Sequence, residues 1–146
     1  MTSLAAGIDV IEIERVRATL TRYPKRFLER VYTQLEVAYC RGRLRELAAR
    51  FAAKEATMKA LGTGIRGVGW RDIEVLADRR GKPLVYLHGR AAARAKTIGM
   101  GQPEVSLTHG KDVAIAYVVA ICEGAPIDYD DARRALIERL RRRGLL

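Results

Sequence analysis

The stretch RLRELAARFAAKEATMKAL, residues Arg43–Leu61, is the longest uninterrupted helical pattern in the chain. On a wheel of about 100° per residue its larger apolar side chains gather on one side. Gly62 follows directly and is a typical residue for ending a helix. Glu55 falls in the middle of the apolar side, and Lys59 lies at its edge one turn further on. A carboxylate that faces a core is costly unless it is paired or binds a metal, which makes Glu55 a candidate functional residue.

A second acidic residue, Asp9, ends a short apolar stretch at Leu4–Val10 that we interpret as a buried strand. Each acid has an ordinary structural explanation. Glu55 and Lys59 have the spacing of a helical salt bridge, and Asp9 is placed to cap a helix that begins near Glu12. The functional alternative is that two carboxylates on different buried elements form an oxygen-ligand site for Mg²⁺.

The elements around the long helix predict an α+β fold in a single domain. Short helices are expected at 12–22 and 26–31, and a third begins at the capping-box pattern Thr33-Gln34-Leu35-Glu36. Further along, we expect one hairpin from 73–77 and 84–87, a small helix at 90–97, a second hairpin from 105–109 and 113–121, and a terminal basic helix at 131–143. Helices mostly come first and strands pair mostly through hairpins, which is typical of the α+β class.

The composition and the charge of the chain favour some classes of protein and argue against others. The chain has 146 residues, a net charge of +10 and 49% hydrophobic residues, which is typical of a globular domain whose surface attracts polyanions. No apolar run approaches the roughly 20 residues that span a bilayer, and the first residues lack a signal-peptide pattern. We therefore expect a cytoplasmic protein without a membrane partner. Cys40 and Cys122 form no CxxC pair, which argues against a zinc or redox motif.

Five motifs occur in an order that resembles the holo-acyl-carrier-protein synthases, the short class of 4′-phosphopantetheinyl transferases. They are GIDV at 7–10, RFAAKEATMKA at 50–60, GTGI at 62–65, GKP at 81–83 and SLTH at 106–109. One such motif is weak evidence, whereas five in order are specific. The resemblance implies an antiparallel sheet packed against a long helix in a single-domain subunit at residues 1–122. Residues 123–146 form a C-terminal extension with a basic helix.

The resemblance also implies a reaction. The 4′-phosphopantetheine arm of coenzyme A, the substrate, moves to a serine of an apo-acyl carrier protein, and 3′,5′-ADP is released. Asp9 and Glu55 are implied to hold Mg²⁺ against the pyrophosphate of coenzyme A. Lys59 matches the lysine that protonates or stabilises the departing 3′,5′-ADP. Asp9, Glu55 and Lys59 are therefore the expected catalytic residues.

Further roles follow from the same resemblance. The implied coenzyme A contacts are Arg50, Lys54, Lys59, Gly62, Ser106, Thr108 and His109. Strand alternation puts Ser106 and Thr108 on one face and His109 on the other, although a lone histidine is more often an ordinary packed or surface residue. The implied docking residues for the acidic helix of a carrier protein are Arg15, Arg22 and Arg26. The family is homotrimeric with sites between subunits, so the resemblance implies sites to which Asp9 and His109 can come from different chains.

Two other functions compete with this hypothesis. The basic charge supports a nucleic-acid-binding domain, but the basic run lacks the interleaved aromatic residues on which bases stack. We therefore expect no nucleic-acid partner. A carrier-binding module without catalysis would not need Asp9, Glu55 and Lys59 together. The sequence departs from the larger transferases at Ile11, where they have a third metal-binding acid, and the short class lacks this acid too.

Overall fold

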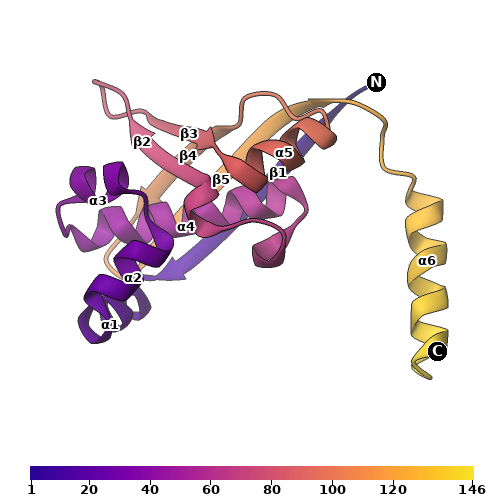
Figure 1. The fold of residues 1–146 in the computed structure, drawn as a ribbon, viewed down its shortest axis with the longest axis horizontal. Coiled ribbons are helices and arrows are strands. Elements are labelled where there is room, and N and C mark those ends of the chain that lie inside the picture. Colours follow the sequence, from indigo (N-terminus) through magenta and orange to yellow (C-terminus); the bar gives the residue numbers. More distant parts are fainter.

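The computed structural model describes residues 1–146 and shows an antiparallel sheet packed against one long helix (Figure 1). The sheet has the strand order β1-β5-β4, and a separate hairpin pairs β2 with β3. The strands are β1 at Thr2–Glu12, β2 at Ile73–Ala77, β3 at Pro83–Leu87, β4 at Glu104–His109 and β5 at Val113–Glu123. The α+β fold expected from the sequence is confirmed.

The helices lie where the sequence predicts them, with small shifts at their ends. They are α1 at Ile13–Arg22, α2 at Pro24–Val31, α3 at Gln34–Cys40, α4 at Leu44–Leu61, α5 at Gly89–Thr97 and α6 at Tyr129–Arg142. Helix α2 begins at Pro24, two residues before the predicted start. Proline is favoured at this first helical position because the N–H that it lacks would have no partner within the helix. The capping box is present: the Glu36 N–H donates to Thr33 Oγ1 at 3.2 Å, and the Thr33 N–H donates to Glu36 Oε1 at 3.0 Å.

The long helix α4 is buried on nearly every side, which differs from the single apolar face expected from the helical wheel. It packs against the sheet strands β1 and β5 and also contacts α1, α3 and the β2–β3 hairpin. Fully buried alanines such as Ala52, Ala53 and Ala56 let these neighbours approach closely. The wheel places Glu55 in the middle of the apolar side, but its side chain is partly exposed. Glu55 therefore does not face the centre of the core.

The closest approach of β1 to α4 occurs at Gly7. A Cβ atom built on this glycine would lie 1.9 Å from the carbonyl oxygen of Ala56, which is far inside van der Waals contact. Gly7 lies two residues before Asp9 on the same face of β1, and Ala56 is the residue after Glu55. Any side chain at Gly7 would therefore push apart the two elements that carry the candidate acids.

The other face of the three-stranded sheet is apolar and uncovered. Alternate residues of β1 and β5 point away from α4, and the large ones are exposed. These side chains are Leu4, Ile8, Val10, Tyr117 and Ile121, with exposed fractions from 47% to 73%. The strand register pairs Leu4 with Ile121 and Ile8 with Tyr117, so the exposed side chains form one continuous patch, the outer sheet face.

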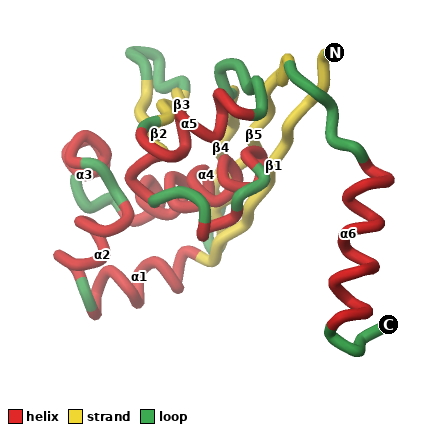
Figure 2. The backbone as a smooth tube through the Cα atoms, turned by 45° about the vertical axis from the view of Figure 1, so that its right-hand side comes forward, coloured by secondary structure: helices red, strands yellow, loops and turns green.

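The C-terminal helix α6 stands apart from the rest of the chain (Figures 1 and 2). It follows β5 after a short linker, and none of its residues is buried. No helix in the structure has the length and the apolar composition that crossing a bilayer requires.

The packing at Gly7 predicts that Gly7→Ala lowers the free energy of unfolding by about 3 kcal/mol or more, because the added methyl group meets backbone that cannot move aside. Gly110→Ala is the matched control, since its added Cβ would have no neighbour within 4 Å. Denaturant unfolding of both variants checks the prediction. Equal midpoints for Gly7→Ala and Gly110→Ala would contradict it.

Candidate functional site

Asp9 and Glu55 lie together where β1 crosses α4. The Asp9 side chain points toward the helix and is only 9% exposed, while Glu55 is partly exposed on α4. Both line a hollow of about 310 Å³ that is also bordered by Arg15, Phe27 and Phe51. The structure therefore brings the two candidate acids into one site that opens to solvent.

The structure shows neither a helix cap at Asp9 nor a salt bridge between Glu55 and Lys59. Strand β1 continues three residues past Asp9, and the residue that precedes α1 as its cap is Glu12. Lys59 forms its ion pair across two elements with Asp9, with 3.3 Å between Nζ and Oδ1, instead of along the helix with Glu55. The Lys59 ammonium also donates to the Ile8 carbonyl oxygen at 2.8 Å. Lys59 is thus held at the site, with 54% of its side chain still exposed.

The electrostatics of the pair fit a bound cation. Burial raises the pKa of Glu55 above its ordinary value, and the negative charge of Asp9 raises it further. The positive charges of Lys59 and Arg15 act in the opposite direction but do not cancel these effects. Two carboxylates that repel each other are stabilised by a divalent metal between them. Asp9 and Glu55 supply two carboxylates, and Mg²⁺ is usually bound by one or two carboxylates together with substrate phosphates and waters.

Gly62 lies at the C-terminal end of α4, and Ser106 and Thr108 lie on the edge strand β4. Gly62 ends α4 with a left-handed backbone at φ 71°, and its N–H donates to the Lys59 carbonyl oxygen at 3.0 Å. Ser106 and Thr108 are exposed on the edge strand β4, whereas Leu107 is partly buried on the opposite side. The predicted alternation is therefore present from Ser106 to Thr108, whereas His109 at the end of the strand is exposed.

His109 lies at the end of β4 and borders a separate hollow of about 410 Å³. Four cationic side chains share this hollow with His109, and they are Arg17, Arg43, Arg45 and Lys111. The register places Ile11, Ala114 and His109 in one row across the sheet. His109 is thus two strand spacings, roughly 10 Å, from the backbone of β1. Within one chain His109 and Asp9 line different hollows.

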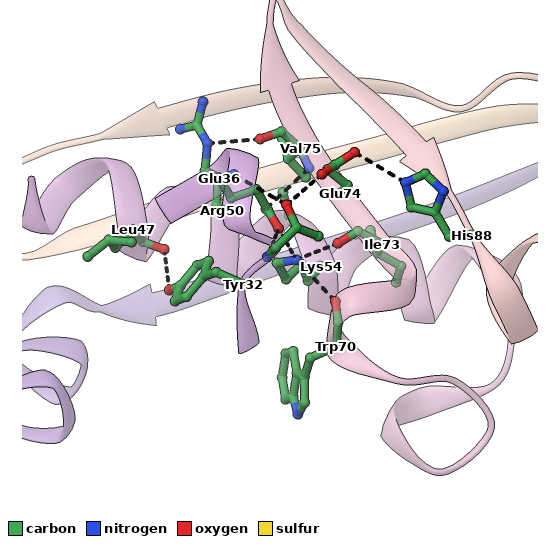
Figure 3. A network of polar contacts seen from close by, with 12 residues as sticks. Tyr32, Glu36, Leu47, Arg50, Lys54, Trp70, Ile73, Glu74, Val75 and His88 are labelled. Carbon is green, nitrogen blue, oxygen red and sulfur yellow. Dashed lines mark hydrogen bonds and ion pairs between the residues drawn. The ribbon is translucent and has the colours of Figure 1, made fainter. Parts of the chain in front are cut away.

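Arg50 and Lys54 are buried inside the chain and point away from the Asp9–Glu55 hollow. Lys54 is fully buried, and its ammonium donates to Glu36 Oε1 at 2.7 Å, to the Trp70 carbonyl oxygen at 3.0 Å and to the Ile73 carbonyl oxygen (Figure 3). With three acceptors the ammonium has no donor left for a phosphate. We therefore assign Lys54 a structural role.

Arg50 is held in the same way. Its Nε donates to the Val75 carbonyl oxygen at 2.9 Å, and its Nη1 donates to Glu46 Oε2 at 2.7 Å. The side chain is 2% exposed, and its guanidinium lies over the ring of Tyr39. The buried positions of Arg50 and Lys54 do not fit the expected contacts with phosphates.

Sequence reasoning missed the partners of these buried cations. The sequence predicts Glu36 only as part of a capping box, yet its second carboxylate oxygen accepts from the Val75 N–H at 3.2 Å. Glu74 accepts from Thr33 Oγ1 at 2.5 Å and contacts His88 Nε2 at 3.2 Å. The alanine-rich composition of α4 was the available signal, because a helix with so many small residues is typically enclosed on several sides.

The three expected docking residues are exposed on the first two helices. Arg15 and Arg22 are on α1, and Arg26 is on α2. Arg15 also lines the Asp9–Glu55 hollow, so the basic surface reaches the edge of the candidate site.

Comparison with known proteins agrees with this geometry. Residues 5–118 match the family model of the 4′-phosphopantetheinyl transferase superfamily. The chain is 47% identical over 125 residues to a holo-acyl-carrier-protein synthase of Herpetosiphon aurantiacus, covering 81% of this chain and 98% of the relative. It is 50% identical over 125 residues to that of Moorella thermoacetica, covering 84% and 95%.

Solved structures show the same fold. The Helicobacter pylori holo-acyl-carrier-protein synthase in complex with coenzyme A has a TM-score of 0.73 at 30% identity, covering 79% of this chain and 98% of that one. The Bacillus anthracis synthase in complex with coenzyme A (3′,5′-ADP) has a TM-score of 0.67 at 37% identity, covering 82% and 96%. The chain therefore belongs to the holo-acyl-carrier-protein synthases of the 4′-phosphopantetheinyl transferase superfamily.

Proposed function

We propose that this enzyme transfers the 4′-phosphopantetheine arm of coenzyme A to a serine of an apo-acyl carrier protein, with Mg²⁺ held by Asp9 and Glu55. The observation that carries the proposal is the meeting of these two carboxylates with Lys59 in one open hollow. Related synthases bound to coenzyme A or to 3′,5′-ADP support the choice of substrate.

The proposed reaction breaks the phosphoanhydride bond of coenzyme A and forms a phosphodiester on the carrier serine. The serine hydroxyl oxygen forms a bond to the phosphorus that bears the pantetheine arm, and the bond from that phosphorus to 3′,5′-ADP breaks. The serine proton passes to a nearby carboxylate or to water as the new bond forms. Bound Mg²⁺ would offset the negative charge of the pyrophosphate. Such transfers depend mostly on positioning and charge stabilisation, because little covalent chemistry falls to the protein.

Different residues of the chain would hold the cation, position Lys59 and bind the phosphates. Asp9 and Glu55 provide the negative charge that holds the cation, and Asp9 fixes the Lys59 ammonium by an ion pair. The anchored and half-exposed Lys59 is placed to donate a proton or a hydrogen bond to the departing 3′,5′-ADP. The cationic hollow at His109 has the chemistry to bind further phosphates of coenzyme A.

We further propose a homotrimer in which each site is shared between two chains. The outer sheet face is a large apolar patch, and such patches typically mark interfaces. In addition, the Asp9–Glu55 hollow and the His109 hollow are separate within one chain. A neighbouring chain could supply the second hollow to the first, which would give the long coenzyme A molecule a continuous site between subunits.

Mass spectrometry of an apo-carrier protein incubated with coenzyme A and Mg²⁺ tests the function directly. The carrier should gain the mass of one phosphopantetheine arm, and a carrier whose acceptor serine is replaced by alanine should gain nothing. Glu55→Gln should abolish transfer, because it keeps the size of the side chain but removes a charge that offsets the metal. Full transfer by the wild-type enzyme in EDTA, or by Glu55→Gln with an unchanged metal requirement, would refute the metal proposal.

The melting temperature of Glu55→Gln provides a second test of the metal proposal. The folded chain binds the Glu55 proton more tightly than the unfolded chain, so ionised Glu55 costs stability as pH rises above its ordinary pKa. In EDTA at neutral pH, Glu55→Gln should therefore melt higher than the wild type. Mg²⁺ should raise the melting temperature of the wild type but not that of the variant.

Charge reversal at Arg15 tests the docking surface. Arg15→Glu should raise KM for the carrier protein about tenfold or more and should change KM for coenzyme A much less, because it places like charge opposite an acidic partner. Arg79→Glu, on the exposed β2–β3 turn, is the matched control for net charge. Equal changes in the two KM values for Arg15→Glu would argue against docking at this residue.

Mixing of two inactive variants tests the shared sites. Asp9→Ala and His109→Ala should each be nearly inactive alone. If their site residues come from different chains, co-refolding the two proteins should restore part of the activity, since some interfaces then carry both native groups. A fully active monomer in sedimentation would contradict shared sites. A trimer that mixing cannot rescue would place Asp9 and His109 of each site on one chain.

A further inference from the structure

Helix α6 lies outside the part of the chain that matches the family, which ends at residue 118. It extends away from the body, and both views show its long axis free of the sheet and of the other helices (Figures 1 and 2). The established fold therefore does not explain why this helix is present. Its side chains are available to a partner, because none of them is buried.

One side of α6 carries an apolar stripe. At about 100° per residue, four apolar side chains fall within a third of the helix circumference. They are Tyr129, Ala132, Leu136 and Leu140. Exposed apolar residues continue beyond both ends of the helix, with Ile127 at 72% exposure before it and Leu145 and Leu146 after it. The stripe is too exposed to stabilise the isolated chain.

Positive charge is concentrated along the same helix. The acids gather at its start, where Asp128 caps the helix by accepting from the Asp131 N–H at 2.9 Å. Residues 133–146 contain six arginines and one glutamate, a formal charge of +5. Only Arg134 and Arg142 form ion pairs, with Asp131 and Glu138. Four arginines remain, and two of them, Arg133 and Arg139, border the apolar stripe on the wheel. Arg141 lies further round the helix, and Arg143 is the C-cap.

We propose that α6 binds an anionic lipid surface, lying flat with the stripe in the headgroup region and the bordering arginines on lipid phosphates. An apolar stripe flanked by basic side chains is the pattern of helices that lie in the membrane interface. The aliphatic part of an arginine side chain covers apolar surface while its guanidinium group reaches polar groups. A nucleic acid would use the charge but leave the stripe without a partner. Because α6 is separated from the sheet and the other helices, its whole length can approach a flat membrane surface (Figure 2).

This proposal revises the expectation that the protein has no membrane partner. That expectation was based on the lack of an apolar segment long enough to span a bilayer, which the structure also lacks. A helix that lies on the surface does not need such a segment, because its backbone hydrogen bonds are internal and only one side leaves water.

Vesicle co-sedimentation of the full chain tests the proposal. The chain should bind vesicles of phosphatidylcholine mixed with phosphatidylglycerol, and it should bind vesicles of phosphatidylcholine alone about tenfold or more weakly. High salt should weaken binding to the anionic vesicles. Equal binding to the two kinds of vesicle, or binding to neither, would overturn the proposal. Retention on single-stranded RNA without vesicle binding would overturn it in favour of a nucleic-acid partner.

Paired variants separate the two parts of the surface. Leu136→Gln with Leu140→Gln removes the apolar side chains without a change in charge, and Arg133→Glu with Arg139→Glu reverses the charge. Each pair should reduce binding to anionic vesicles about tenfold or more. Arg79→Glu with Arg80→Glu makes the same change in net charge on the β2–β3 turn and should leave binding nearly intact. An equal loss in this control, or undiminished binding by the leucine variant, would overturn the proposal. All three variants should transfer phosphopantetheine normally without vesicles, so a failure here is distinct from a failure of the proposed reaction.

Discussion

The contact between Gly7 and the carbonyl oxygen of Ala56 is the constraint on which the site depends. Strand β1 and helix α4 approach so closely there that no side chain fits between them. The residues next to this contact are Asp9, on the same face of the strand, and Glu55, one position before Ala56 on the helix. Two acids far apart in sequence are thereby forced together, although burial and, after it, the charge of Asp9 raise the pKa of Glu55. The close packing of the core maintains an arrangement that the charges alone oppose.

A buried ion pair fixes α4 from the opposite side. Burial lowers the pKa of Lys54, and the carboxylate of Glu36 acts in the other direction. Removing either partner would leave an uncompensated buried charge, which is strongly destabilising. Lys54 and Glu55 are adjacent in sequence but have different tasks, since a step of about 100° around the helix turns one inward and the other to the open hollow. This arrangement explains why a lysine and a glutamate stand side by side in the motif.

The sequence predicts the elements well because local chemistry determines them. Gly62 ends α4, the Thr33 capping box starts α3, and turn residues separate the hairpin strands. The meeting of Asp9 and Glu55 was expected from the family resemblance, since periodicity alone did not distinguish it from a cap and a salt bridge. The roles of Arg50 and Lys54 could not be predicted in this way. Whether a charged residue on a helix contacts solvent or a buried carboxylate depends on which elements pack around the helix. A helical wheel does not contain this information, because it assumes a single apolar side.

The central claim is that the packing of β1 on α4 creates a two-carboxylate metal site. Anomalous diffraction from crystals of the enzyme grown with Mn²⁺ and coenzyme A tests it most directly, since Mn²⁺ prefers the same oxygen ligands as Mg²⁺. We predict one strong peak per site, within about 2.5 Å of carboxylate oxygens of both Asp9 and Glu55, with a phosphate oxygen of coenzyme A as a further ligand. A peak elsewhere in the chain, or a loaded coenzyme A site with no metal between the two acids, would contradict it.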